Sequence, residues 1–258
     1  MPFLVFTGIF AREISMQFFW AFLAFFLLQI CLILIVLIWS KIFPLSKKEN
    51  AIFRLNATVG NIVNFGLPLC IGIFGEESVA IISMFILATQ LVLQTAGIFF
   101  ISNGTKTPKE SFFTIFKMPI FWAILLALFL QILHVKIPPL LYDTLKNFGK
   151  VAITLSVFIF GISLSHLKFS SFPVRLFFQS VLLRMFIAPF IALGIIKILP
   201  LEKIVANVFF VEATVPLGIY IVILSDVFDC DASHAASIVL ASTILSIVSI
   251  PAWVILVL

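Results

Sequence analysis

The chain has 258 residues, of which 63% are hydrophobic and 10% are charged, and its formal net charge is +5. An ordinary soluble domain is about 45–50% apolar and about 25% charged. The composition therefore excludes water-soluble folding and predicts an all-α integral membrane protein that contacts membrane lipid. Because the basic residues lie in short connections and form no continuous basic face, we expect no nucleic-acid partner.

Apolar segments long enough to cross a bilayer follow one another along the chain. A spanning helix needs about 20 mostly apolar residues, because the hydrocarbon core is about 30 Å thick. The shorter segment 2–11 reaches only about half that depth before Arg12 and Glu13 interrupt it. The fifth qualifying segment spans only with its flank from Leu145 included. The segments are 15–40, 57–74, 79–102, 115–133, 151–165, 172–199, 205–224 and 235–258.

Two of these segments carry a proline at matching places. Asn64 lies four residues before Pro68, Glu212 lies four residues before Pro216, and each segment continues into an acidic connection and one more helix. Each proline lacks an amide hydrogen and clashes with the preceding turn, so we expect the helices to open at Pro68 and Pro216. Ordinary proline kinks are the alternative. The matched pair favours a functional interpretation.

Paired, interrupted helices in two halves indicate a transporter built from inverted repeats. We expect inverted five-helix repeats whose two proline-broken helices cross, with about 8.5 of ten transmembrane helices present. Residues 1–102 would hold a partial N-terminal repeat, comprising half of helix 2 and helices 3 to 5. Residues 103–117 would form a cytoplasmic connection, which Lys106 and Lys109 make basic. Residues 118–258 would hold the C-terminal five-helix repeat.

Polar side chains beside the first proline suit a negative ligand. Half-helix N-termini carry roughly half a positive charge, and the amides of Asn61 and Asn64 could hold a carboxylate without placing a fixed charge in the membrane. The alternative for both is interhelical hydrogen bonding, worth about 0.6 kcal/mol. Gln90 and Gln94 follow at helical spacing and could complete a polar lining, although Gln90 is more typical of helix packing.

Two ionisable residues fall at membrane depth. Glu212 occupies the place that Asn64 has in the first half, and such a residue is a functional hypothesis by default. It would carry a coupling H+ or hold a Na+, or it would pair with Arg184. Arg184 lies near the middle of its segment, where it costs about 2.5–3.5 kcal/mol, so it needs a partner or water. Structural pairing and attraction of substrate both remain open for Arg184.

Signatures of enzymes and metal sites are missing from the sequence. It contains no phosphate-binding GxxxxGK[ST] loop, no HExxH pair and no GxSxG turn, so we expect no enzyme activity. The three cysteines and three histidines lack the spacing of a metal site. We therefore expect no cofactor beyond a coupling H+ or Na+.

Two stretches carry a family resemblance: GNIVNFGLPLCIGIFGEESVAI at 60–81 and EATVPLGIYIVILSDVFDCDASHAASIVLASTILSIVSIP at 212–251. They resemble the auxin efflux carrier family, the membrane transport proteins that include plant auxin exporters and bacterial malonate or malate permeases. The resemblance implies ten helices in two inverted repeats that bind organic anions beside a crossover of broken helices. It matches Asn61 to a carboxylate-binding asparagine and places Gln94 on a neighbouring helix. Glu212 departs from the small residues of the plant exporters, which argues against auxin as the substrate.

The start of the chain resembles the middle of that family's second helix, so we expect an N-terminally truncated carrier. The predicted function is secondary transport of a small organic anion, a carboxylate, by alternating access around Asn61, Asn64, Pro68, Glu212 and Pro216. The alternative is a membrane ligand sensor without transport, or an inactive truncated carrier. We expect a multi-pass protein of the bacterial inner membrane, and the resemblance implies a homodimer.

Overall fold

The computed structural model describes residues 1–13, 15–102, 116, 119–165 and 172–257, and these residues form helices and no strand. Three of the elements are wider π-helical turns, labelled η. The elements are α1 (Pro2–Phe10), α2 (Met16–Ile42), α3 (Lys47–Thr58), η1 (Ile62–Gly66), α4 (Leu67–Phe74), α5 (Ser78–Val92), η2 (Leu93–Gly97), α6 (Ile98–Ile101), α8 (Pro119–Ile132), α9 (Pro139–Ser165), α10 (Val174–Val181), η4 (Leu182–Ile187), α11 (Ala188–Ile198), α12 (Lys203–Thr214), α13 (Tyr220–Val227) and α14 (Ala232–Val257).

Several helices have the length and composition of membrane spans, which confirms a multi-pass, all-α membrane protein. Four of them exceed 18 residues, namely Met16–Ile42, Ser78–Ile101, Val174–Ile198 and Ala232–Val257, and two apolar helices are shorter, Ile62–Phe74 and Pro119–Ile132. The α9 helix begins at Pro139, earlier than predicted, because proline is favoured in the first helical turn. The predicted connection 103–117 lies, apart from Phe116, outside the described residues. The division into two repeats stays a prediction.

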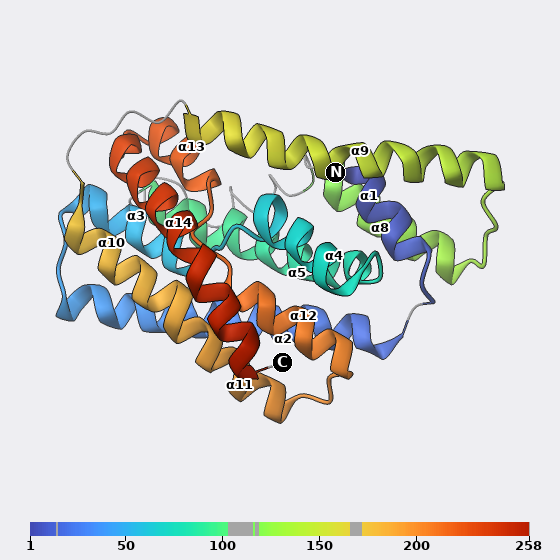
Figure 1. The fold of residues 1–258 in the computed structure, drawn as a ribbon, viewed down its shortest axis with the longest axis horizontal. Helices are drawn as coiled ribbons and strands as arrows, with labels where there is room; N and C mark the ends of the chain where they lie inside the picture. The colour runs from blue at the N-terminus through green and yellow to red at the C-terminus, as the bar shows by residue number, and fades with distance from the viewer. Residues whose placement is uncertain (14, 103–115, 117–118, 166–171, 258) are drawn as a thin grey trace.

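Helices α1, α8 and α9 pack together at one end of the molecule, and α9 lies along its edge (Figure 1). The remaining helices form a larger body in which α2, α5 and α12 share an aromatic core. The ring of Phe25 stacks on that of Phe85 with centroids 4.8 Å apart, and the edge of Phe209 closes the group. The smaller body meets the larger one mainly through α1 against α5 and α9 against η1.

The first broken helix opens at residues 59–61, so the prediction that it opens at Pro68 is wrong. The α3 helix begins at a capping box between Ser46 and Glu49 and ends at Thr58. After the break, η1 and α4 run continuously through Pro68. The missing amide of Pro68 is accommodated because the preceding turn widens, with Gly66 N–H donating to the carbonyl oxygen of Asn61 at 3.0 Å.

The same accommodation of proline recurs in the second half of the chain. The π-turn η4 ends two residues before Pro189, as η1 ends two residues before Pro68. Proline inside a membrane helix is tolerated where such local widening satisfies the freed backbone groups again. Pro68 and Pro189 therefore each follow a π-turn in a helix that continues through the proline.

The second broken helix opens at Pro216, as predicted. Helix α12 ends at Thr214, residues 215–219 are not helical, and α13 begins at Tyr220. The two breaks meet, because Gly60 pairs with Leu217 in an isolated antiparallel β-bridge. The predicted crossing of two broken helices is therefore present, with Gly60 opposite Leu217 and Asn61 bonded to Pro216.

Candidate functional site

Backbone hydrogen bonds join the two broken helices at their crossing, which we call the crossover (residues 59–61 and 215–219). The Asn61 N–H donates to the carbonyl oxygen of Pro216 at 3.0 Å, and the Leu217 N–H donates to the hydroxyl of Ser242 on α14 at 3.3 Å. Unpaired backbone groups cost several kcal/mol in hydrocarbon, and these bonds remove part of that cost. The crossover is thus a junction in which the two open segments are bonded to each other and to α14.

A cavity of about 230 Å³ lies against this junction. Its wall includes the N-terminal ends of both second half-helices, η1 and α13. The first amides of a helix have no partner within the helix, and the helix dipole places partial positive charge there. The cavity is lined by Leu55, Asn56, Val59, Gly60, Asn61, Ile62, Val63, Asn64, Thr89, Gln90, Leu93, Gly218, Ile219, Tyr220 and Ile221.

The structure brings Asn61 and Asn64 into this cavity wall, as the sequence predicted. The side-chain nitrogen of Asn61 is buried and has no hydrogen-bond partner within the described part of the chain. Gln90, assigned to helix packing from the sequence, also lines the cavity, and its side-chain oxygen is likewise without a partner there. Buried polar atoms normally find partners, so the Asn61 nitrogen is a candidate donor to a ligand, whereas the Gln90 oxygen can only accept a hydrogen bond.

Asn56 is a cavity residue that the sequence analysis missed. Its side chain is 1% exposed, and neither its oxygen nor its nitrogen has a partner among the residues that the structure describes. A signal was present, because Asn56-Ala57-Thr58-Val59-Gly60 repeats the pattern of Glu212-Ala213-Thr214-Val215-Pro216. In both stretches the helix ends at the threonine, Thr58 or Thr214. Asn56, and not Asn64, therefore corresponds to Glu212.

Other predicted site residues lie near the cavity without forming its wall. Gln94 is buried in η2, one turn after Gln90, and Pro68 lies in α4 beyond the π-turn. Pro216 contributes its carbonyl group to the crossover but does not line the cavity. Thr89 of the wall is held by Gln29 of α2, whose side-chain nitrogen donates to its hydroxyl at 2.9 Å.

Arg184 lies directly against the crossover and is fully buried. Its Nη2 donates to the backbone carbonyl oxygen of Glu212 at 3.1 Å, one of the last carbonyls of α12. Gly60 leaves the space for it, because a Cβ there would lie 2.5 Å from Nε and 2.6 Å from Cζ. The guanidinium thus meets the negative end of the α12 dipole, and its Nε and Nη1 have no partner in the described chain.

Glu212 is also fully buried, but its carboxylate makes no ion pair with Arg184 in the described structure. Oε1 accepts a hydrogen bond from the thiol of Cys70 at 3.6 Å, and Oε2 has no partner among the described residues. Gly66 of η1 makes room for the carboxylate, since a Cβ there would lie 2.5 Å from Cδ. The side chains of Arg184 and Glu212 therefore lie against Gly60 and Gly66 of the first broken helix, and neither residue lines the cavity.

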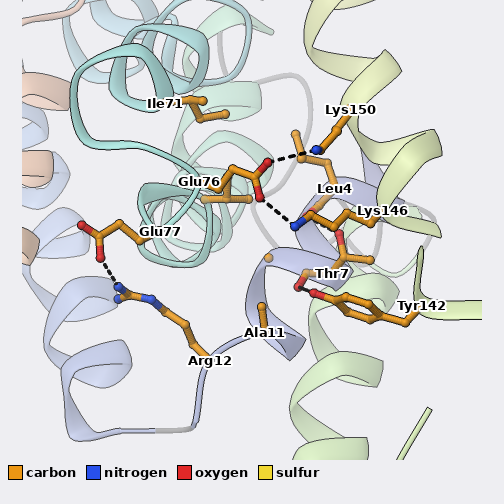
Figure 2. Close-up of a pocket in the computed structure, with 12 residues that line it drawn as sticks. Leu4, Thr7, Ala11, Arg12, Ile71, Glu76, Glu77, Tyr142, Lys146 and Lys150 are labelled. Carbon is orange, nitrogen blue, oxygen red and sulfur yellow. Dashed lines mark hydrogen bonds and ion pairs between the residues drawn. The ribbon is translucent and has the colours of Figure 1, made fainter. Parts of the chain in front are cut away.

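A second cavity, also of about 230 Å³, lies between α1, the connection from α4 to α5, and α9 (Figure 2). Its charged groups are paired. Glu76 accepts from Lys146 at 2.9 Å and from Lys150 at 3.3 Å, and Arg12 lies 2.7 Å from Glu77. Lys146 and Lys150 reach the same carboxylate because they are one helical turn apart. These pairs connect the smaller body to the larger one.

The ion pairs of the second cavity set the charge of Glu76. Chiefly the hydrogen bond from Lys146 lowers the pKa of Glu76; partial burial opposes this, and Lys150 adds to the lowering. The carboxylate is consequently ionised at neutral pH. Because these side chains are partly exposed to solvent, each pair contributes about 0–1 kcal/mol. The second cavity is therefore a contact between helices, and the cavity at the crossover is the stronger candidate site.

Two broken helices that cross beside a cavity lined by several amide side chains are typical of membrane transporters. The model of the membrane transport protein family matches residues 1–254, and the chain belongs to that family. This confirms the resemblance found in the sequence.

Two relatives described as uncharacterized transporters come from archaea. One, from Methanocaldococcus jannaschii, is 25% identical over 229 residues, which cover 86% of this chain and 73% of the relative. The other, from Methanothermobacter thermautotrophicus, is 25% identical over 224 residues, covering 85% and 72%. The family and these relatives show that the chain is a membrane transporter.

Proposed function

We propose that the protein is a secondary carrier of a small organic anion, which binds as a carboxylate in the cavity at the crossover. The observation that carries the proposal is the pair of side-chain amide nitrogens of Asn56 and Asn61, two residues of one cavity wall, which have no partner in the described chain. Amide N–H groups and the starts of η1 and α13 would stabilise a carboxylate without a permanent charge in the wall.

The cavity, of about 230 Å³, is large enough for a short mono- or dicarboxylate. Alternating access would then expose the crossover to either side of the membrane while the smaller body of α1, α8 and α9 moves relative to it.

Counterflow in proteoliposomes tests the proposal. Vesicles loaded with unlabelled malonate, malate or lactate should take up the same labelled acid faster than protein-free vesicles. Asn61→Ala should slow this exchange about tenfold or more, because it removes an amide that would otherwise bind the carboxylate. Asn50→Ala is the matched control, since Asn50 lies on α3 outside the cavity wall.

Absence of exchange with every acid would overturn the proposal. Binding of one of these acids without any flux would instead favour the alternative of a ligand sensor. Equal exchange by the wild type, Asn61→Ala and Asn61→Ala combined with Glu212→Gln would remove the crossover as the binding site.

A further inference from the structure

Arg184 and Glu212 are the only Asp, Glu, Lys or Arg side chains that are buried within the described residues, and both are 0% exposed. Every other such group that the structure describes is at least partly exposed. The charge of the crossover therefore depends on these two side chains alone. Arg184 is permanently positive, because a guanidinium does not lose its proton in proteins.

The protonation state of Glu212 sets the net charge of the crossover. With an ionised carboxylate, the two side chains together carry no net charge; with a protonated carboxyl group, the crossover carries one positive charge. A net charge in a medium of low polarity is costly unless an opposite charge accompanies it. A bound anion supplies that opposite charge, since Arg184 contacts Gly60, a residue of the cavity wall.

From this balance we infer that Glu212 binds one proton whenever the cavity binds one negative charge, so that the carrier moves a singly charged carboxylate together with one H+. The inference rests on the proposed function and identifies its coupling ion. Coupling follows because each ligand stabilises the charge state that favours the other, and such coupling is reciprocal by thermodynamic necessity. A monocarboxylate, or a dicarboxylate that keeps one proton, is the substrate class that this balance selects.

The surroundings of Glu212 favour H+ over Na+. A hard cation requires several oxygen ligands, but the hydrogen-bond partner of Oε1 is the thiol of Cys70, and Gly66 offers no side chain. Carbonyls at the end of a broken helix can hold a cation in such carriers. Here the carbonyl oxygen of Glu212 already accepts a hydrogen bond from the guanidinium of Arg184.

The titratable groups around Glu212 are few. Cys70 faces it from α4 and Arg184 from η4. Helix α5 and the turn η1 carry no titratable side chain. Helix α2 carries Cys31 and Lys41, helix α11 carries Lys197, and helix α14 carries His234. Lys41, Lys197 and His234 lie within three residues of a helix end, and Cys31 is half-buried. Glu212 is therefore the acid positioned to exchange a proton at the crossover.

Uptake of labelled lactate into proteoliposomes tests the inference, with protein-free vesicles subtracted. A pH step of about 1.5 units, acidic outside, should drive accumulation toward about 30-fold without Na+, because each pH unit is worth a factor of ten per coupled proton. In Glu212→Gln, accumulation should not respond to the pH step, because the amide cannot take up a proton. Glu202→Gln is the matched control, since its exposed side chain lies at the start of the same helix.

A measurement on the wild type alone keeps the test independent of folding in the variant. Cotransport of one proton with one monoanion moves no net charge, so a membrane potential set with valinomycin and K+ should not change lactate accumulation. Accumulation that requires Na+, that follows the membrane potential, or that still responds to the pH step in Glu212→Gln would overturn the inference and leave the carrier assignment intact. Absence of any counterflow in the wild type would instead overturn both.

Discussion

Replacing Gly60 by alanine should disrupt the crossover through Arg184. The φ angle of Gly60 lies outside the left-handed region, so the backbone itself admits alanine. The new Cβ would lie 2.6 Å from Cζ of Arg184 and would overlap Nη2, while the fully buried guanidinium cannot swing into solvent. Displacing it breaks the 3.1 Å bond to the carbonyl oxygen of Glu212.

The expected loss of stability has two parts. A hydrogen bond to a charged group is worth about 1.5–3 kcal/mol, and overpacking of a filled interior costs about 1–3 kcal/mol. The sum of at least about 2.5 kcal/mol corresponds to a fall in Tm of about 5–10 °C for a chain of this size. Tryptophan fluorescence during heating of the detergent-purified protein measures this fall.

Gly72→Ala is the matched control, because a Cβ at Gly72 meets no atom within 4 Å and the residue lies in helix α4. It should be neutral or slightly stabilising, by up to about 1 kcal/mol. Equal Tm values for Gly60→Ala, Gly72→Ala and the wild type would refute the contact between Arg184 and the crossover.

Two further predictions concern the backbone of the crossover and the ion pairs of the second cavity. Ser242→Ala should lower stability by about 1–3 kcal/mol, because it leaves the buried N–H of Leu217 unpaired. Ser246→Ala should change little, because that hydroxyl bonds to a carbonyl of its own helix. Equal Tm values for the two variants would contradict this prediction. Glu76→Gln should lower Tm slightly at pH 7. The difference should begin to shrink as the pH falls below about 4.3, the pKa of an unfolded glutamate, because folding lowers the pKa of Glu76 and its ionised form carries the stability. A difference that is equally large at pH 7 and pH 3 would contradict the pairing with Lys146.

Composition and apolar length were sufficient to predict the helices and the membrane. Each of the predicted segments that the structure describes is helical over most of its length, because hydrophobic thickness alone fixes the size of a spanning helix. Proline was the less reliable signal. Pro216 marks a break, but Pro68 lies within a continuous helix because a π-turn absorbs its missing hydrogen bond.

The candidate site was predictable in part. Asn61 and Asn64 lie in the cavity because their distance from the break is set by local sequence, whereas Asn56 was missed because the repeats were aligned on their prolines. The position of Arg184 could not be predicted. It depends on the tertiary packing of η4 against the crossover and on the absence of a side chain at Gly60.

Protection of a thiol in the cavity tests the central claim most directly. Val63→Cys places a thiol in the cavity wall, and in a Cys31→Ser background the remaining native thiols, Cys70 and Cys230, are buried. A transported acid should slow the reaction of this thiol with a water-soluble maleimide at concentrations that saturate counterflow, and it should leave a thiol at the exposed position of Glu202→Cys unaffected. Unchanged labelling of Val63→Cys at saturating acid would mean that the anion binds elsewhere.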